Sequence, residues 1–294
     1  MNIKKRPGAY SMENAQLKAL IDLLDDPDDL VFKSVSQELR DKGEDAIPYL
    51  EKAWEETFNE TLQERIEDVI QQIQFRAVKT QLQRWLNEGA DNLLEGCYIL
   101  TRFQYPDLKY ESLVDEVEKI RQDVWLEINN NLTALEKVKI INHIIFEVHK
   151  FAGNTSNFYS PQNCYLNQVF ETHRGNPISL SVVYLLVAQR LGVPIYGVNL
   201  PKNFLLAYVD EWFMQEDQQV LFYINPFNRG VILGKREIDY FIKQQKLRPH
   251  ESFYEPCGHE DIIKRLILNL ILAYENLGHQ DKILRLQELI NLFR

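Results

Sequence analysis

The 294-residue chain has few cysteines, no long apolar run and no cluster of basic residues. Cys97, Cys164 and Cys257 are scattered and odd in number, which argues against a disulfide framework and predicts a reducing compartment, namely the cytoplasm. The basic residues near the N-terminus precede no apolar run, and no later segment approaches the ~18 apolar residues of a membrane-spanning helix. We therefore expect neither a secretory signal nor membrane binding.

The charge balance and the missing ligand motifs exclude further classes of function. The formal net charge is −10, whereas binding to a phosphate backbone depends on lysine and arginine, so a nucleic-acid partner is not expected. The sequence has no Gly-rich phosphate loop, so we expect no nucleotide cofactor. His143 and His149 are six residues apart on a predicted helix, and Cys257 and His259 form only a single close pair, so we expect no metal site.

The composition that remains, at 45% hydrophobic and 26% charged residues, is typical of an ordinary globular protein. In residues 1–79, short amphipathic helices alternate with stop signals such as the DDPDD turn and Gly43, and this region looks like HEAT-repeat units. It either presents a surface to a partner or only supports its neighbour. Residues 251–294 form a predicted helical hairpin around Gly278 that resembles one tetratricopeptide unit and should pack on the core.

The middle region, residues 80–250, combines helices with strands. A predicted helix over residues 179–191 is apolar nearly all round, which is typical of a helix in the middle of a domain. Short β-rich runs with turn signals between them follow it, at residues 194–200, 204–209, 220–225 and 230–233. The predicted fold class is α+β and mostly helical, with a central helix packed on a small antiparallel sheet and helical repeats on both sides.

Four sequence blocks carry a resemblance to a known family. They read LEGCYILTRFQYPDL, FYSPQNCYLNQVFETHRGNPISLSVVYLLVAQRLGVPIYGV, FLLAYV and YINPFNRGVIL. In order and spacing these blocks resemble the bacterial transglutaminase-like proteins of the SirB type, over residues 82–233. The terminal hairpin is also similar to that family's, whereas the HEAT-like front end lies outside the resemblance. The resemblance implies a transglutaminase or papain-like core.

In that superfamily the resemblance also implies a Cys–His–Asp arrangement, in which a histidine oriented by a carboxylate activates a cysteine at a helix N-terminus. Carried over by position, the nucleophile falls at or next to Pro177, the histidine on Asn203 and the aspartate on Asn225. Proline offers no nucleophile, and asparagine neither accepts a proton nor carries charge at neutral pH. The resemblance therefore implies a catalytically degenerate member, a pseudoenzyme.

Such a protein can keep a binding pocket after it has lost its catalytic residues. Asn203, Asn225 and Asn228 offer amide donors and acceptors that suit a peptide or a polar small molecule, or else they merely bridge strand ends. Ser179 and Ser181 lie near the helix start, where an unassisted hydroxyl is a poor nucleophile and capping is the simpler role. The predicted vestigial pocket consists of Arg174, Asn176, Pro177, Ser179, Ser181, Asn203, Asn225 and Asn228.

The sequence thus predicts an inactive transglutaminase-like protein that acts as a protein- or peptide-binding or regulatory module, through its groove or its helical repeats. The alternative is a divergent cysteine hydrolase or acyltransferase that uses Cys164. His173 is nearby, but the two residues are nine positions apart on one short predicted helix, so their side chains should point apart. A third interpretation is a structural scaffold whose groove is closed by side chains.

Overall fold

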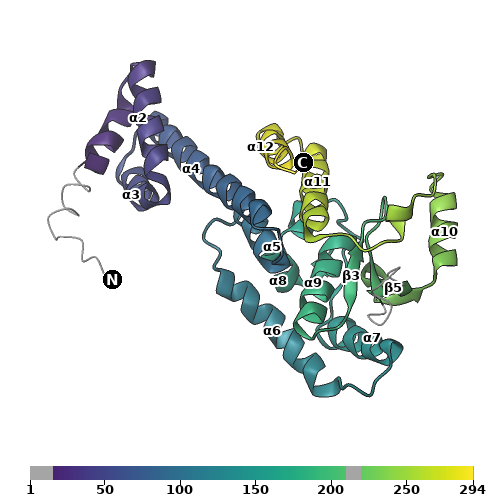
Figure 1. The fold of residues 1–294 in the computed structure, drawn as a ribbon. Helices are drawn as coiled ribbons and strands as arrows, with labels where there is room; N and C mark the ends of the chain where they lie inside the picture. Colours follow the sequence, from purple (N-terminus) through teal and green to yellow (C-terminus); the bar gives the residue numbers. More distant parts are fainter. Residues whose placement is uncertain (1–15, 210–219, 294) are drawn as a thin grey trace. The chain divides into compact units, whose positions relative to one another are not determined.

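The computed structural model of the chain describes residues 16–209 and 220–293 (Figure 1). Residues 1–15, on which the expectation about a secretory signal rests, lie outside the described residues. Helices dominate the secondary structure and a small sheet accompanies them, which confirms the predicted α+β class. Over the described part of the chain, no helix combines the length and the apolar character that crossing a membrane requires.

The chain divides into two compact units, residues 1–81 and residues 82–294. The first unit is built from short helices whose leucine, isoleucine and valine side chains share one apolar core. The most deeply buried members of that core are Leu24, Leu39, Leu50, Ile66 and Val69. The elements are a helix over 16–22, η1 (Leu23–Asp25), α2 (Asp29–Lys42), η2 (Gly43–Ala46), α3 (Ile47–Glu56) and the first part of α4 (Glu60–Asn87).

Both ends of α2 follow the signals in the sequence. The side chain of Asp28 accepts a hydrogen bond from the backbone N–H of Leu30 over 2.8 Å, which caps the start of the helix. Gly43 ends the helix with φ +70°, in the left-handed region that glycine adopts without steric cost. The predicted stop signal at Gly43 is therefore confirmed here, whereas the HEAT-like character of the region stays a prediction.

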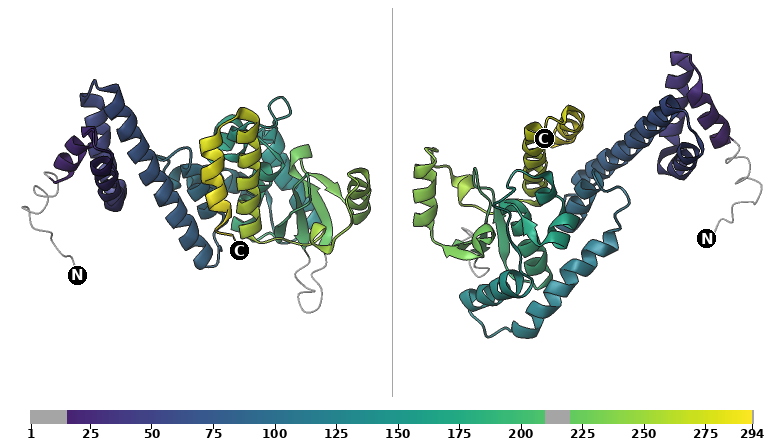
Figure 2. Two further views of the ribbon diagram at one scale, coloured as in Figure 1. Left: turned by 90° about the horizontal axis from the view of Figure 1, so that it is seen from above. Right: turned by 180° about the vertical axis from the view of Figure 1, so that it is seen from behind.

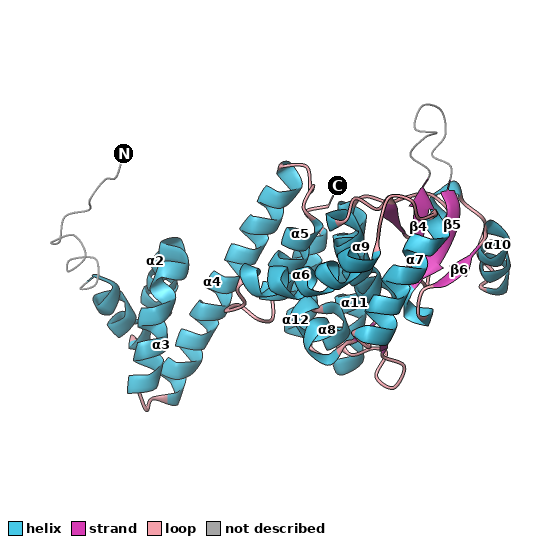
Figure 3. Cartoon of the chain, turned by 90° about the horizontal axis from the view of Figure 1, so that it is seen from below, coloured by secondary structure: helices cyan, strands magenta, loops and turns pink. Residues whose placement is uncertain are grey.

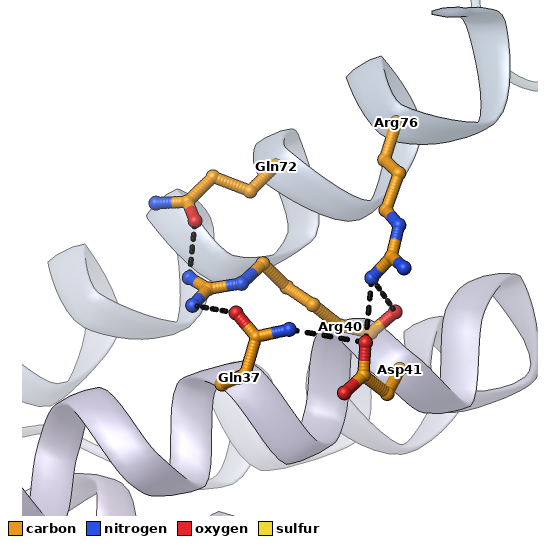
Figure 4. Close-up of polar contacts among 5 residues, drawn as sticks. All are labelled: Gln37, Arg40, Asp41, Gln72 and Arg76. Carbon is orange, nitrogen blue, oxygen red and sulfur yellow. Dashed lines mark hydrogen bonds and ion pairs between the residues drawn. The ribbon is translucent and has the colours of Figure 1, made fainter. Parts of the chain in front are cut away.

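A polar cluster joins α2 to α4 on the surface of the first unit (Figure 4). Arg40 donates hydrogen bonds to the side-chain oxygens of Gln72 and Gln37, and Arg76 donates to a carboxylate oxygen of Asp41 over 2.7 Å. Hydrogen bonds from Arg76 and Gln37 lower the pKa of Asp41. The side chains of Arg76 and Asp41 are each 56% exposed, so this pair adds little stability, and the apolar core holds the unit together.

Helix α4 is a single helix of 28 residues. No glycine or proline interrupts residues 60–87, so nothing in the local sequence breaks the backbone hydrogen-bond ladder. The predicted boundary between residues 79 and 80 falls inside this helix. The division of the chain into three domains at 79/80 and 250/251 stays a prediction.

The second unit contains further helices around a four-stranded sheet (Figure 2). A separate two-stranded sheet pairs β1 (Ala152–Gly153) with β2 (Arg174–Gly175). The two C-terminal helices, yellow in Figure 2, lie side by side and pack against each other. The helical elements after α4 are α5 (Leu93–Arg102), α6 (Tyr110–Glu127), α7 (Ala134–Asn142), the π-helix η3 (His143–Val148), η4 (Pro161–Cys164), α8 (Leu166–Thr172), α9 (Pro177–Arg190), η6 (Pro226–Asn228), α10 (Lys235–Gln244), η7 (Glu251–Phe253), α11 (His259–Leu277) and α12 (Gln280–Ile290).

The sheet is antiparallel, and its strands follow one another in chain order (Figure 3). Its strands are β3 (Ile195–Val198), β4 (Leu205–Val209), β5 (Val220–Asn225) and β6 (Val231–Leu233). In the register, Ala207 lies opposite Tyr196 on one side and Tyr223 on the other. This arrangement confirms the small antiparallel sheet predicted from the sequence.

Strand β4 is buried along its whole length because both faces of the sheet are covered. Leu205, Ala207 and Val209 belong to one apolar cluster with Ile238 and Ile242 of α10. Side chains alternate between faces along a strand, so the residues between them point to the opposite face, where α9 packs on β3 and β4. Helix α9 thus lies beneath the sheet, and its residues from 178 to 188 are all buried.

The two edges of the sheet differ. On the β3 side, the backbone N–H of Cys257 donates to the carbonyl of Gly197 over 2.7 Å, which forms an isolated antiparallel bridge. On the other side, β6 has only three residues. One edge is therefore partly covered by a later segment, and the other is short.

Candidate functional site

A pocket of about 390 Å³ lies where helix α9 begins. Segments far apart in the sequence line it: the loop before η4, the start of α9, the connection between β3 and β4, and one face of α11. Its polar lining includes Cys164, Asn176, Lys202, Asn203 and Arg265, and its apolar lining includes Phe158 and Leu272. A volume of this size is within the range of small-ligand pockets.

The start of α9 forms part of the pocket wall. The Oδ1 atom of Asn176 accepts from the backbone N–H of Ser179 over 2.9 Å, and the hydroxyl of Ser179 accepts from the N–H of Asn176 over 3.0 Å. Pro177 occupies the first helical position, where its missing N–H costs nothing. The helix start is thus satisfied by its own side chains, as a reciprocal capping box.

Asn203 also lines the pocket, as Pro177 does. Its Oδ1 accepts a hydrogen bond from the backbone N–H of Phe204 over 2.8 Å. The preceding residue, Lys202, has φ +63°, so the β3–β4 connection turns sharply just before Asn203. The structure therefore brings two of the three triad-equivalent positions, Pro177 and Asn203, to one pocket.

Asn225 and Asn228 do not line this pocket. The side chain of Asn225 accepts from the backbone N–H of Asn228 over 3.3 Å and caps the short helix η6. Phe227 lies between them, and its ring packs edge-on against that of Phe158, with centroids 5.8 Å apart. The side chain of Asn225 and the backbone of Asn228 thus form a turn outside the lining of this pocket.

The remaining residues predicted for the pocket have structural contacts of their own. Arg174 is exposed and donates to the backbone carbonyls of Lys150 and His173, each over 3.1 Å. Ser179 serves in the capping box, and the hydroxyl of Ser181 donates to the carbonyl of Pro177 over 2.7 Å. The side chains of Arg174, Ser179 and Ser181 are not part of the pocket lining.

Cys164 is buried in the pocket wall. Its Sγ atom accepts a hydrogen bond from the side-chain amide of Asn176 over 3.2 Å. Burial raises the pKa of the thiol to about 12, although the hydrogen bond from Asn176 acts in the opposite direction. At neutral pH the residue is therefore a thiol, which is a far weaker nucleophile than a thiolate.

Cys164 and His173 do not share a helix, so that part of the prediction is wrong. Cys164 ends η4, and Tyr165 is extended, with φ −92° and ψ 119°, before α8 begins at Leu166. His173 follows α8 with φ 54°, in the left-handed region. The extended residue resets the helical phase, so the spacing argument does not apply.

The ring of His173 nevertheless has hydrogen-bond and stacking partners other than Cys164. Its Nδ1 atom forms a hydrogen bond with the backbone carbonyl of His149, and the ring stacks on that of Phe151 with centroids 4.7 Å apart. Within the described residues, no histidine is hydrogen-bonded to Cys164. The geometry thus supplies no base for this thiol.

Several lining residues gave no signal in the sequence. Arg265, Asn269 and Leu272 come from one face of α11, far from the blocks that carry the resemblance. Only the packing of α11 against α5, η4 and α9 brings them to the pocket. Among the described residues, no group of three or more His, Cys, Asp or Glu side chains could hold a metal ion.

Comparisons with known proteins agree with the central part of the fold. The family profile of the transglutaminase-like superfamily matches residues 111–268. A UPF0162 protein of Xylella fastidiosa is 34% identical over 209 residues, which cover 66% of this chain and 68% of the relative. F-box only protein 21 of Mus musculus is 30% identical over 158 residues, 52% of this chain and 24% of that protein. The UPF0162 protein YchA of Escherichia coli is 24% identical over 204 residues, 68% of this chain and 73% of that protein. No solved structure matches. The chain belongs to the transglutaminase-like superfamily.

Proposed function

We propose that this transglutaminase-like protein is catalytically degenerate and acts as a protein- or peptide-binding or regulatory module. One observation carries the proposal. The pocket at the start of α9 is lined by Pro177 and Asn203, the two positions where the family resemblance puts the nucleophile and the base. Neither of these residues has a side chain suited to that chemistry, whereas the pocket itself has room for a ligand.

Further parts of the proposal concern the setting of the pocket. We assign the protein to the SirB type, with a HEAT-like region over residues 1–79 and a tetratricopeptide-like hairpin over residues 251–294. The helical ends are additional contact surfaces for a protein partner, and neither nucleic acid nor a membrane is a partner. A reducing compartment, the cytoplasm, suits a protein whose three cysteines are all free.

The proposal is tested by measuring binding and turnover on the same protein. The purified protein is presented with a panel of peptides, and both binding and the hydrolysis or cross-linking of amides are recorded. We expect saturable binding without turnover. Leu272→Trp should abolish binding, because Leu272 is 46% exposed at the pocket and a larger ring there fills the space.

The matched control is Leu284→Trp. Leu284 is 54% exposed on α12 and is not part of the pocket lining, so this variant should bind peptides as the unmodified protein does. Turnover of any peptide amide, or equal binding by both tryptophan variants, would contradict the proposal.

A second candidate function is a divergent cysteine hydrolase or acyltransferase, and the position of Cys164 in the pocket wall favours it. The raised pKa of the thiol argues against it. Cys164→Ser separates the two functions, because it removes the sulfur but keeps a small polar group. Amide turnover that is lost in this variant would establish the second candidate.

A further inference from the structure

The charge of the pocket is opposite to that of the whole protein. Its lining contains two cations, Lys202 and Arg265, and no aspartate or glutamate among the described residues that form it. The full sequence has 43 acidic and 33 basic residues. A pocket with only positive side chains in an acidic protein attracts anions and discourages cations.

Arg265 has spare capacity to bind. Its one hydrogen bond in the described part of the chain runs from Nη1 to the side-chain oxygen of Asn199, over a long 3.4 Å. A guanidinium has five N–H donors, so most of them have no acceptor among the described residues. Burial lowers the pKa of this group, as expected of a cation that is partly removed from water and has no carboxylate beside it.

Exposed apolar side chains line the pocket and continue along α11. Arg265, Leu268 and Leu272 recur at helical spacing on one face of α11, where Leu268 and Leu272 are 45% and 46% exposed. Phe158 and Tyr159, which line the pocket from the loop before η4, are 40% and 58% exposed. The cation therefore lies among exposed apolar groups that suit neighbouring side chains of a peptide.

We propose that this pocket binds a peptide carboxylate flanked by apolar side chains, with Arg265 as its ion-pair partner and Lys202 at the rim. The inference rests on the proposed function and names the ligand of the same pocket. A single half-buried guanidinium between apolar walls matches a monoanion, because a phosphate dianion is usually met by several arginines. The carboxylate is supplied either by the C-terminus of the bound peptide or by an Asp or Glu residue within it.

The test uses three unlabelled, N-acetylated hexapeptides of leucine and alanine, whose binding to the full-length protein is measured by isothermal titration calorimetry. One ends in a free carboxylate, one ends in an amide, and one ends in an amide but carries an internal glutamate. We expect the amide-only peptide to bind at least about 30-fold more weakly than the better of the two acidic peptides. The acidic peptide that binds more tightly identifies the source of the carboxylate, and its affinity should fall as salt is raised.

Variants at neighbouring positions of α11 attribute the effect to Arg265. Arg265→Gln should weaken the acidic peptide about 30-fold while leaving the amide-only peptide unchanged. Lys264→Gln removes the same charge one residue earlier, outside the pocket lining, and should leave both affinities unchanged. Arg265→Lys keeps the charge without the planar guanidinium. Its affinity for the acidic peptide should lie between the affinities of Arg265→Gln and Lys264→Gln. Circular dichroism checks that each variant is folded.

The outcomes separate this inference from the proposed function. Equal binding of acidic and amide-only peptides, or equal losses from Arg265→Gln and Lys264→Gln, would overturn the carboxylate assignment and leave peptide binding intact. Displacement of the acidic peptide by inorganic phosphate but not by acetate would also overturn it. Failure of every peptide to bind would overturn the proposed function as well.

Discussion

The hydroxyl groups of Tyr165 and Tyr274 lie 2.9 Å apart and join residues 109 positions apart in the sequence. The hydroxyl of Tyr274 donates to the side-chain oxygen of Gln104 over 3.2 Å, so the proton between the two tyrosines belongs to Tyr165. Lys282 donates to the same oxygen of Gln104 over 2.6 Å. This series of hydrogen bonds links the segment before α8, which carries the wall of the pocket, to the C-terminal helices.

Because the hydrogen bonds run from Tyr165 to Tyr274 and on to Gln104, removing the two tyrosine hydroxyls should lower the free energy of unfolding by different amounts. Tyr274→Phe leaves the buried hydroxyl of Tyr165 without an acceptor, which should cost about 1–3 kcal/mol. Tyr165→Phe leaves Tyr274 still bonded to Gln104 and should cost about 0.5–1.5 kcal/mol. Urea unfolding of both variants and of the double variant measures these differences. A larger cost for Tyr165→Phe would contradict the assigned direction.

Removing the hydroxyl of Tyr184 should stabilise the fold, in contrast to the other two tyrosines. It is fully buried in α9, and its hydroxyl has no hydrogen-bond partner among the described residues. A buried hydroxyl without a partner destabilises the folded state, so Tyr184→Phe should raise the free energy of unfolding by roughly 1 kcal/mol. The same urea titration measures it, and Tyr165→Phe is the matched control at a partnered tyrosine. A loss of stability in Tyr184→Phe would show that its hydroxyl is satisfied.

Alkaline pH should destabilise the fold through its buried acids. Burial raises the pKa of Tyr184 well above its ordinary value of 10.0 and that of Cys164 from 9.0 to about 12. Because the raised pKa favours the neutral form in the fold, this stabilisation is complete below the ordinary pKa and is lost as pH rises toward the folded value. Urea unfolding between pH 8 and about pH 12 should therefore show a steady decrease. The free energy of unfolding of Tyr184→Phe should decrease less over this range. A free energy of unfolding of the unmodified protein that does not change across the range would contradict the expectation.

Cys164 should react slowly with an alkylating reagent. At pH 8 a rise in pKa from 9.0 to about 12 reduces the thiolate fraction about 1000-fold. Iodoacetamide labelling of the folded protein, mapped by mass spectrometry, should thus be slower at Cys164 by at least about this factor than in the urea-unfolded protein. The unfolded protein gives the rate of a fully accessible thiol, and the burial of Cys164 slows the reagent further in the fold. Fast and selective labelling of Cys164 in the folded protein would instead favour the cysteine hydrolase.

Two glycines with the same backbone conformation should respond differently to alanine. Gly192 and Gly230 have φ +64° and +73°, so an alanine at either position costs about 1–2 kcal/mol in the left-handed region. A Cβ atom at Gly192 meets nothing within 4 Å, whereas one at Gly230 overlaps the side-chain amide of Asn142. That amide donates to the carbonyl of Gly230 over 2.8 Å.

We therefore expect Gly230→Ala to cost at least about 1 kcal/mol more than Gly192→Ala, because overpacking adds to the backbone strain. Urea unfolding measures both variants. If the two costs are equal, the turn after β5 can shift away from Asn142 without loss, and the close contact is not needed for stability.

The sheet and the central helix could be predicted because their signals are local. The strand runs at residues 194–200, 204–209, 220–225 and 230–233 each contain the observed strand. The apolar run that begins at Ser179 predicts a buried helix, and the structure adds only the capping turn from Pro177. In these segments the pattern of apolar residues and the turn residues point to the same structure.

The pocket could be predicted only in part, because it depends on long-range packing. Asn176 and Pro177 stand in a block that resembles a known family, and Asn203 directly precedes another such block. All three residues line the pocket. Arg265 belongs to a predicted helical hairpin with an ordinary amphipathic sequence, so no local pattern indicates that this residue lines a pocket. Likewise, the two-residue pairing of β1 (Ala152–Gly153) with β2 (Arg174–Gly175) is too short to leave a periodic signal.

The bridge between Gly197 and Cys257 has a consequence for how the protein behaves at high concentration. Strands that expose unpaired backbone groups act as templates on which other molecules add and polymerise. Here the outer side of β3 already uses one carbonyl to bind Cys257, and β6 offers only three residues for such growth. Neither border of the sheet is therefore a good seed for fibres, and prolonged storage should yield little cross-β material.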